Sequence, residues 1–282
     1  MSFVACSGHS LNELKGSTLI WPSVSIGNVP QLTVDLLLST LELQRCGFIH
    51  DSSVIPVVGG IDTVDGSASV GVTTPCEVFI SADKKYTFIQ QRAPVEKNRR
   101  NQYIETLLDF IQSAGIQQVI ALTSADAGSR MDMQIESQPF RILVPSRNAC
   151  SDFLLERGRA LGIPQMEDIP LSESDISFQQ YHHPHRQLNN HHSSIPRIAG
   201  GGLSRRLLTR LSAAEIDSAG LVMFALEGDN VSDSIHMANC VNALLQLVDP
   251  QGNMPLRLET YTDKKSSMRF METTKELART VW

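Results

Sequence analysis

No stretch of this sequence approaches eighteen uninterrupted apolar residues, so no segment has the composition of a membrane-spanning helix. Basic residues are also in deficit, because 24 Lys and Arg stand against 30 Asp and Glu and give a formal net charge of −6. Nucleic-acid phosphates need a basic face, so this balance argues against nucleic acid as a partner. A basic protein surface is compatible with it, but so small an excess identifies no partner.

Cysteine is sparse, and the chain has no C-x-x-C pair. The five cysteines are Cys6, Cys46, Cys76, Cys150 and Cys240. An odd and scattered set is typical of reduced thiols and not of a disulfide framework. The first ten residues contain no basic stretch followed by a long apolar run, so we expect no export signal. These features predict a cytoplasmic and nuclear protein.

Catalytic signatures are missing as well. The sequence contains no G-x-S-x-G nucleophile elbow and no H-E-x-x-H zinc motif. Their absence does not exclude an enzyme, since catalytic groups need only meet in space. It does leave no catalytic residue, no metal ligand and no cofactor to assign with positive support.

What is present describes a globular protein, with 41% hydrophobic and 19% charged residues over 282 positions. Apolar periodicity and Gly or Pro boundaries predict alternating helices and strands. The expected strands are 17–27, 76–81, 86–92, 116–125 and 219–230, and the expected helices are 28–47, 101–115, 148–161 and 231–248, with another after Gly202. This alternation predicts a single α/β domain over residues 1–250, with a mixed, partly parallel sheet flanked by helices. Residues 251–282 form a C-terminal tail without a strong pattern.

Two of the expected helices are unusually apolar. Leucines and valine cover nearly every side of the first one between Leu32 and Leu43, and the last presents an apolar face from Val231 to Val248. A helix that is apolar all round is buried against a sheet, against another subunit, or against both. Core packing is the more common outcome, and an interface is the alternative.

The stretch from Pro164 to Pro196 is rich in Ser, Gln, Asn and acidic residues and predicts a long mobile loop. Imidazole is a common metal ligand, and this stretch contains five of the eight histidines, namely His182, His183, His185, His191 and His192. No cysteine lies beside them and the segment is too polar to order itself. A solvated loop is therefore the first interpretation, and metal binding is the weaker one.

Three consecutive glycines, Gly200, Gly201 and Gly202, open the helix that carries Arg205 and Arg206. Glycine turns at helix starts bind phosphate, because bare backbone N–H groups and the helix dipole converge there. The spacing fits neither G-x-x-x-x-G-K-[ST] nor G-x-G-x-x-G. The pattern therefore favours a tight strand-to-helix corner over an anion site, and the two arginines keep the anion site open as an alternative.

Carboxylates also gather at the end of a predicted central strand, in the run Glu227, Gly228, Asp229 and Asn230. Enzymes with α/β folds often keep catalytic groups at such strand ends, so an acid–base pair is one hypothesis. Asp229 and Asn230 are also good caps for the helix that follows, and capping is the simpler explanation.

Four of these stretches resemble, in the same order, the proteasome assembly chaperone 2 family, the second subunit of the heterodimeric chaperone that builds the proteasome alpha ring. They are "PSVSIGNVPQLTVDLLLSTL" with Gly27 and Asn28, "QPFRILVPS", "IAGGGLSRRLL" and "ALEGDNVSDSIHMANCVNALL". Each motif alone is weakly specific. The four together span roughly residues 15–248.

The resemblance implies a fold like that of nucleoside phosphorylases, used as a binding scaffold without catalysis. In that case Gly27, Asn28, the three glycines and the run Glu227–Asn230 shape loops and caps. The implied partners are proteasome assembly chaperone 1, in a heterodimer, and alpha subunits in core-particle assembly intermediates. The implied role is to promote alpha-ring assembly and to prevent ring dimers and premature activator binding. The alternative is a phosphorylase-like enzyme acting on a nucleoside or a phosphorylated small molecule.

The C-terminus departs from this family pattern. Some relatives end in a hydrophobic–tyrosine–any tripeptide that inserts between alpha subunits, whereas this chain ends in Thr280, Val281 and Trp282. A terminal carboxylate with an adjacent apolar side chain can still pair with a lysine in an apolar pocket. A frayed tail, or a tail packed on its own domain, is the alternative.

Overall fold

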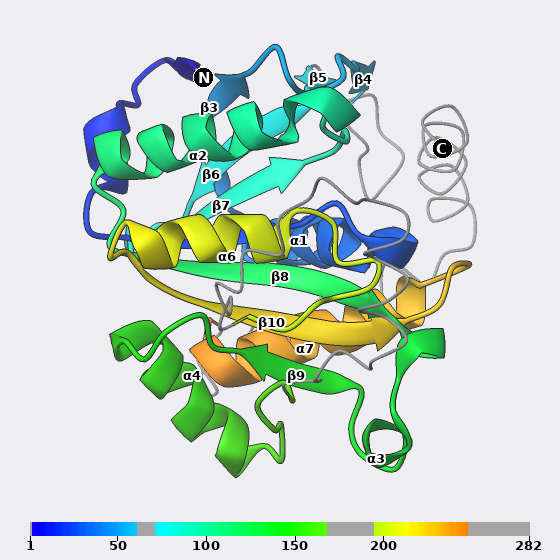
Figure 1. Ribbon diagram of the computed structural model, residues 1–282. Coiled ribbons are helices and arrows are strands. Elements are labelled where there is room, and N and C mark those ends of the chain that lie inside the picture. The colour runs from blue at the N-terminus through cyan, green and yellow to red at the C-terminus, as the bar shows by residue number, and fades with distance from the viewer. Residues whose placement is uncertain (1, 61–70, 168–194, 248–282) are drawn as a thin grey trace, which may run out of the picture.

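The computed structural model describes residues 2–60, 71–167 and 195–247. Its centre is an eight-stranded sheet with the strand order β1-β3-β6-β7-β2-β8-β10-β9 (Figure 1). The strands are β1 (Ser2–Ala5), β2 (Thr18–Pro22), β3 (Gln44–His50), β6 (Cys76–Ile80), β7 (Tyr86–Gln91), β8 (Gln118–Asp126), β9 (Phe140–Leu143) and β10 (Asp217–Ala225). A separate small pair is formed by β4 (Gly59–Gly60) and β5 (Val72–Thr73).

The sheet is mixed, as the sequence predicts. The neighbours β7, β2, β8 and β10 run parallel to one another, and the pairs toward both edges are antiparallel. β8 and β10 read as almost continuous apolar runs because both of their faces are covered, and seven of nine residues in β8 and eight of nine in β10 are buried. These four strands therefore form the buried centre of an α/β domain.

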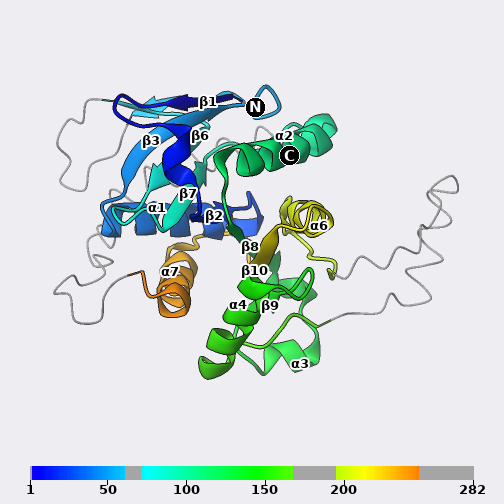
Figure 2. The same cartoon turned by 90° about the vertical axis from the view of Figure 1, so that its left-hand side faces the viewer.

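Helices cover both faces of the sheet (Figure 2). On one face lie α1 (Val29–Thr40), α4 (Ala149–Ala160) and α7 (Val231–Leu245), and on the other lie α2 (Arg100–Ala114) and α6 (Ser204–Ala213). The short helices are η1 (Leu11–Leu14), η2 (Ile26–Asn28), η3 (Lys97–Arg99), η4 (Ala127–Ser129) and α3 (Asp132–Ile135). Each face has its own apolar core, and this gives a three-layer arrangement.

The two most apolar helices pack inside this chain. α1 and α7 lie against each other, and the Thr33 hydroxyl donates a hydrogen bond of 3.2 Å to the Ser234 carbonyl. The core on this face includes Val34 and Leu37 of α1 and Val241 and Leu244 of α7. Their apolar residues therefore serve the core of the domain. Val248, the last residue of the predicted apolar face, lies outside the described residues.

The first predicted helix ends earlier than expected. It was expected to continue to Gly47, but α1 ends at Thr40 and Gln44–His50 forms strand β3. The chain reverses at Glu42, which has a left-handed φ of 49°, and the Leu43 N–H donates to the Leu38 carbonyl. Leu41 and Leu43 continue the apolar pattern past this turn, and no glycine marks it. For this reason the periodicity alone was misleading.

The ends of the predicted mobile loop are also ordered. Most of Pro164–Pro196 lies outside the described residues, but 164–167 run beside β9, where the Met166 N–H donates to the Ile142 carbonyl at 2.8 Å. Met166 and Ile195 are buried. Among the described residues, no helix is both long and apolar enough to cross a bilayer.

Candidate functional site

The three loops that follow β2, β8 and β10 meet at one end of the parallel strands. In α/β sheets, this carboxyl end of the strands is where ligands bind. A fourth segment, 199–204, comes from the start of α6 and joins these loops. The Ile26 N–H donates to the Gly200 carbonyl, and the Asp126 N–H donates to the Ala199 carbonyl, both at 2.9 Å. The predicted glycine turn therefore lies at the position of a ligand site.

Backbone groups of the glycine turn are bonded within the protein. The Gly201 carbonyl accepts hydrogen bonds from the hydroxyls of Ser23 at 3.1 Å, Thr123 at 3.0 Å and Ser204 at 2.7 Å. The Gly201 N–H donates to the Ile198 carbonyl, and the Leu203 N–H donates to the Ser23 hydroxyl. An anion site needs N–H groups of this kind directed at a ligand. These two are directed at protein oxygens.

The glycines are required by conformation and by space. Gly200 and Gly202 have φ values of 74° and 59°, in the left-handed region. A Cβ at Gly202 would lie 2.1 Å from the Val24 carbonyl oxygen, and one at Gly201 would lie 2.5 Å from an Ile198 side-chain atom. The turn is thus a tight corner between α6 and the loop after β2.

The two arginines of α6 also bind protein groups. The Arg205 Nε donates to the Ile195 carbonyl at 3.0 Å, and the Arg206 guanidinium donates to the Asn101 side chain. These contacts direct both guanidiniums at carbonyl oxygens of neighbouring segments. The geometry therefore favours the corner over the anion site.

The predicted loops at Gly27 and at Glu227–Asn230 come together in space. Asn230 Nδ2 donates to the Gly27 carbonyl at 3.3 Å and to the Gly228 carbonyl at 3.1 Å, so it ties the β10 loop to the β2 loop. Gly27 has a φ of 68°, and a Cβ there would lie 2.5 Å from Asn230 Nδ2. These contacts make a second bridge at the same end of the sheet.

The helix caps differ in detail from the expectation. Asn230 occupies the N-cap position of α7, but it makes no side-chain cap hydrogen bond, and Asp229 Oδ1 instead accepts from the Val231 N–H at 3.2 Å. Asn28 is the N-cap residue of α1 in a left-handed conformation, with a φ of 53°, and Gln31 Nε2 donates to its Oδ1 at 3.0 Å. Glu227 and Asp229 are both exposed. The described hydrogen bonds give no acid–base pair between them.

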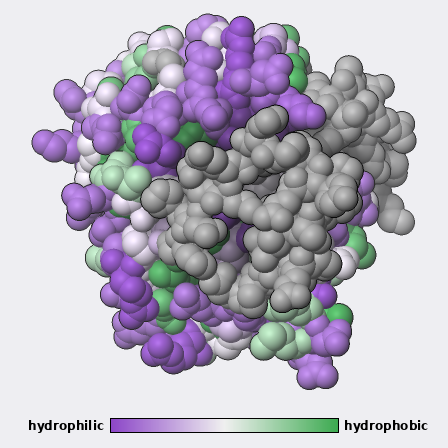
Figure 3. All heavy atoms as spheres, in the orientation of Figure 1, coloured by the Kyte–Doolittle hydropathy of each residue, from purple (hydrophilic) through white to green (hydrophobic). Residues whose placement is uncertain are grey.

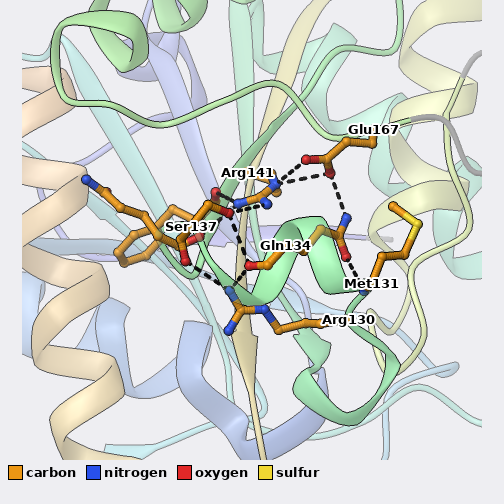
Figure 4. A network of polar contacts seen from close by, with 8 residues as sticks. Arg130, Met131, Gln134, Ser137, Arg141 and Glu167 are labelled. Atoms are coloured by element: carbon orange, nitrogen blue, oxygen red, sulfur yellow. Dashed lines mark hydrogen bonds and ion pairs between the residues drawn. The ribbon is translucent and has the colours of Figure 1, made fainter.

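A polar network beside this end of the sheet was not predicted (Figure 4). Arg141, on β9, is fully buried, and its Nε lies 2.9 Å from Glu167 Oε1. Gln134 Nε2 of α3 donates to Glu167 Oε2 at 2.6 Å, and the Ser137 hydroxyl accepts from Arg141 at 2.8 Å. The Arg130 guanidinium donates to the carbonyls of Gln134 and Ser137. The only signal for this network was Arg141 within the "QPFRILVPS" motif.

Several sequence predictions concern residues outside the described part of the chain. These are Thr280, Val281 and Trp282, the tail 251–282, and the five histidines between 182 and 192. Within residues 2–60, 71–167 and 195–247, no group of three or more His, Cys, Asp or Glu side chains is arranged to hold a metal ion. The predictions for the tail and the histidine segment therefore stay predictions.

Comparison with protein families decides the classification. The model of the PAC2 family matches residues 19–227, which include most of β2, the glycine corner and all of β10. The chain belongs to the PAC2 family. Curated relatives of this PAC2 chain are named proteasome assembly chaperone 2. The human relative is 31% identical over 260 residues, with 90% of each chain covered, and the Danio rerio relative is 31% identical, with 89% of this chain and 92% of its own covered.

Solved structures show the same fold for this PAC2 chain. Pyrococcus furiosus PbaA, described as an archaeal homolog of proteasome-assembly chaperone, superposes with a TM-score of 0.64 over 99% of both chains at 14% identity. Pyrococcus furiosus PbaB, described as an archaeal proteasome activator, gives 0.58 over 99% of this chain and 98% of its own at 11% identity. The expected α/β fold is confirmed. The likeness to nucleoside phosphorylases stays a prediction.

Proposed function

We propose that this protein is a non-catalytic subunit of a proteasome assembly chaperone. The observation that carries the proposal is its similarity, over about nine-tenths of both chains, to proteins named proteasome assembly chaperone 2. In the proposed role it forms a heterodimer with proteasome assembly chaperone 1 in the cytoplasm and nucleus. The heterodimer binds alpha subunits, promotes assembly of the alpha ring, and prevents ring dimers and premature activator binding.

The geometry supports a scaffold more than an enzyme. An α/β enzyme holds its ligand at the carboxyl end of the parallel strands. Here that position contains three hydroxyls that all donate to the Gly201 carbonyl, from Ser23, Thr123 and Ser204. A phosphorylase-like site there would need free donors aimed at an anion. The same contacts strengthen the junction between the β2, β8 and α6 segments, which is what a rigid binding scaffold requires.

Affinity purification of the tagged full-length chain from its own cells tests the proposal. We expect one similarly sized α/β chain and alpha-type proteasome subunits, identified by mass spectrometry, without mature activator. The enzyme alternative predicts that inorganic phosphate or a nucleoside stabilises the purified protein, by about 2.7 kcal/mol at 100 times Kd. A chain that is recovered alone and is stabilised by phosphate would contradict the chaperone role.

The C-terminal residues Thr280–Trp282 belong to the same proposal as a contact with the alpha ring. In this contact the side chain of Val281 or of Trp282 would fill an apolar pocket. Deletion of the three residues should weaken binding to purified core particles without changing the thermal stability. Unchanged affinity after deletion would remove the tail from the proposal and leave the rest intact.

A further inference from the structure

The one-turn helix α3, between β8 and β9, exposes two large apolar side chains. Met133 is 64% exposed and Ile135 is 60% exposed. Figure 3 shows a generally hydrophilic surface in this orientation, and part of its apolar area lies at the lower right, where Figure 1 places α3. The two side chains share one helical turn, and Leu226, 61% exposed, lies at the same end of the sheet, so this end of the molecule is a candidate contact surface for another protein.

Hydrogen bonds and an ion pair hold this turn against the rest of the domain. A helix of four residues is not stable by itself, because the conformational entropy lost in nucleation exceeds the free energy gained from the hydrogen bonds of one turn. Here Gln134 is buried, its Oε1 accepts from the Met131 N–H at 3.1 Å, and its Nε2 donates to Glu167. Glu167 is held in turn by Arg141, whose side chain is 1% exposed. The contacts thus hold the turn in place, while the side chains of Met133 and Ile135 are exposed to solvent.

The geometry of one helical turn defines what the surface offers. Successive residues are about 100° apart around the axis. With Gln134 directed inward, Met133 and Ile135 lie on the two flanks, while Asp132 and Glu136 lie on the side away from the sheet. Both acidic residues are exposed. We call Asp132, Met133, Ile135 and Glu136 the α3 knob. Its apolar flanks are Met133 and Ile135, and its acidic crown is Asp132 and Glu136.

The surroundings have the same character. At the same end of the sheet, the loop after β10 exposes Leu226, Glu227 and Asp229. Arg130, the basic residue next to the turn, is directed at the carbonyls of Gln134 and Ser137 and stacks 5.1 Å from the Phe224 ring centroid. The exposed charge near the knob is therefore negative, in keeping with the net charge of −6. Its complement is a basic surface.

We propose that the α3 knob inserts into a cleft on an alpha-type proteasome subunit, with apolar walls and Lys or Arg side chains at its floor. This inference rests on the proposed function for the identity of the partner. Its chemistry rests on the knob alone. The apolar flanks supply most of the affinity, because they are desolvated on docking, and the acidic crown supplies orientation and association rate.

The test compares two double variants of the full-length chain. Met133→Ser/Ile135→Ser removes the flanks of the knob. Val58→Ser/Val72→Ser is the matched control, because these side chains are 74% and 52% exposed in the part of the chain that carries β4 and β5. Binding to purified core particles and to isolated alpha-type subunits is measured by surface plasmon resonance. We expect at least a tenfold loss of affinity for the knob variant, less than a twofold change for the control, and unchanged melting temperatures for both.

Further measurements distinguish the effect of the acidic crown from that of the apolar flanks. They also test the knob proposal separately from the proposed function. Asp132→Asn/Glu136→Gln should lower the association rate and flatten its salt dependence, while a photoreactive residue at Ile135 should crosslink to an alpha-type subunit. If the wild type binds, Met133→Ser/Ile135→Ser binds equally well and no crosslink forms, then the knob proposal is overturned and the proposed function stands. Failure of the wild type to bind any alpha-type subunit would overturn both.

Discussion

Gly202 lies where the corner before α6 meets the loop after β2, and its Cα has no room for a side chain. Its φ of 59° is costly for any L residue, and a Cβ would lie 2.1 Å from the Val24 carbonyl oxygen. Gly202→Ala should therefore lower the free energy of unfolding by about 3 kcal/mol, measured by urea denaturation. Gly60→Ala is the control, since a Cβ there meets nothing within 4 Å and the change should stay within about 0.5 kcal/mol. Equal effects would refute the steric argument.

Arg92 and Arg210 each donate hydrogen bonds from two nitrogens to one carboxylate, but one pair is largely buried and the other is exposed. Arg92 contacts Asp35 of α1 at 2.8 and 3.0 Å and lies near Glu77, whose side chain is 1% exposed. Arg210 contacts Glu105 at 2.6 and 2.8 Å, with both side chains about half exposed. Arg92→Ala removes both hydrogen bonds that the partly buried Asp35 accepts and leaves the buried Glu77 with its contact to Arg45 at 2.7 Å, so it should cost about 3 kcal/mol. Arg210→Ala should cost less than about 1 kcal/mol in the same urea titration, and similar losses would show that burial is not the deciding factor.

Some contacts between single residues could be predicted from the sequence, and others could not. The glycine corner was visible because consecutive glycines before a helix signal a special backbone. The partners of Arg92 and Arg141 were not visible, since Asp35 and Glu167 are 57 and 26 positions away in the chain. A buried ion pair between distant residues follows from strand order. Strand order is not encoded in local periodicity.

At the scale of elements, the α3 turn depends on the protonation of one carboxyl group. Burial alone would raise the pKa of Glu167, but hydrogen bonds from Gln134 and the charge of Arg141 outweigh it and hold the pKa below its ordinary value. A lowered pKa in the folded state adds stability above the unfolded value, near 4.3, and this stability is lost as the pH falls through the folded value. The free-energy difference between wild type and Glu167→Gln should therefore be largest at pH 7 and shrink below about pH 4. A difference for Glu167→Gln that is constant with pH would contradict the prediction.

Elements with a complete pattern were predicted well, and those held by tertiary contacts were not. The hairpin β6–β7 and the helices α2, α4, α6 and α7 were predicted because each has its own periodicity or boundary residue. Gly115, for example, ends α2 with a φ of 65°. The end of α1 was wrong because its reversal uses Glu42 and not a glycine. The helix α3 was missed because four residues are too few for a period.

At the scale of the whole molecule, four of the five cysteines are divided between the two apolar cores, one on each face of the sheet. Burial raises the pKa of Cys46, Cys150 and Cys240 to about 12 and places that of Cys76 far above its ordinary value. Cys46 and Cys76 lie in the sheet core facing α2, whereas Cys150 and Cys240 lie in the core facing α1. Cys6 is only partly buried. A buried thiol that is also protonated cannot react until the structure around it opens.

These positions turn thiol labelling into a test of the single-domain prediction. At pH 8 a disulfide reagent should label one thiol, Cys6, rapidly in the native protein. If both cores belong to one cooperative unit, the other four should become reactive together, over the same urea range in which the circular dichroism signal is lost. Mass spectrometry of the labelled peptides identifies each thiol. Labelling of Cys150 and Cys240 at lower urea than Cys46 and Cys76 would show that the α1–α7 face opens separately, and the chain would then consist of two cooperative units sharing one sheet.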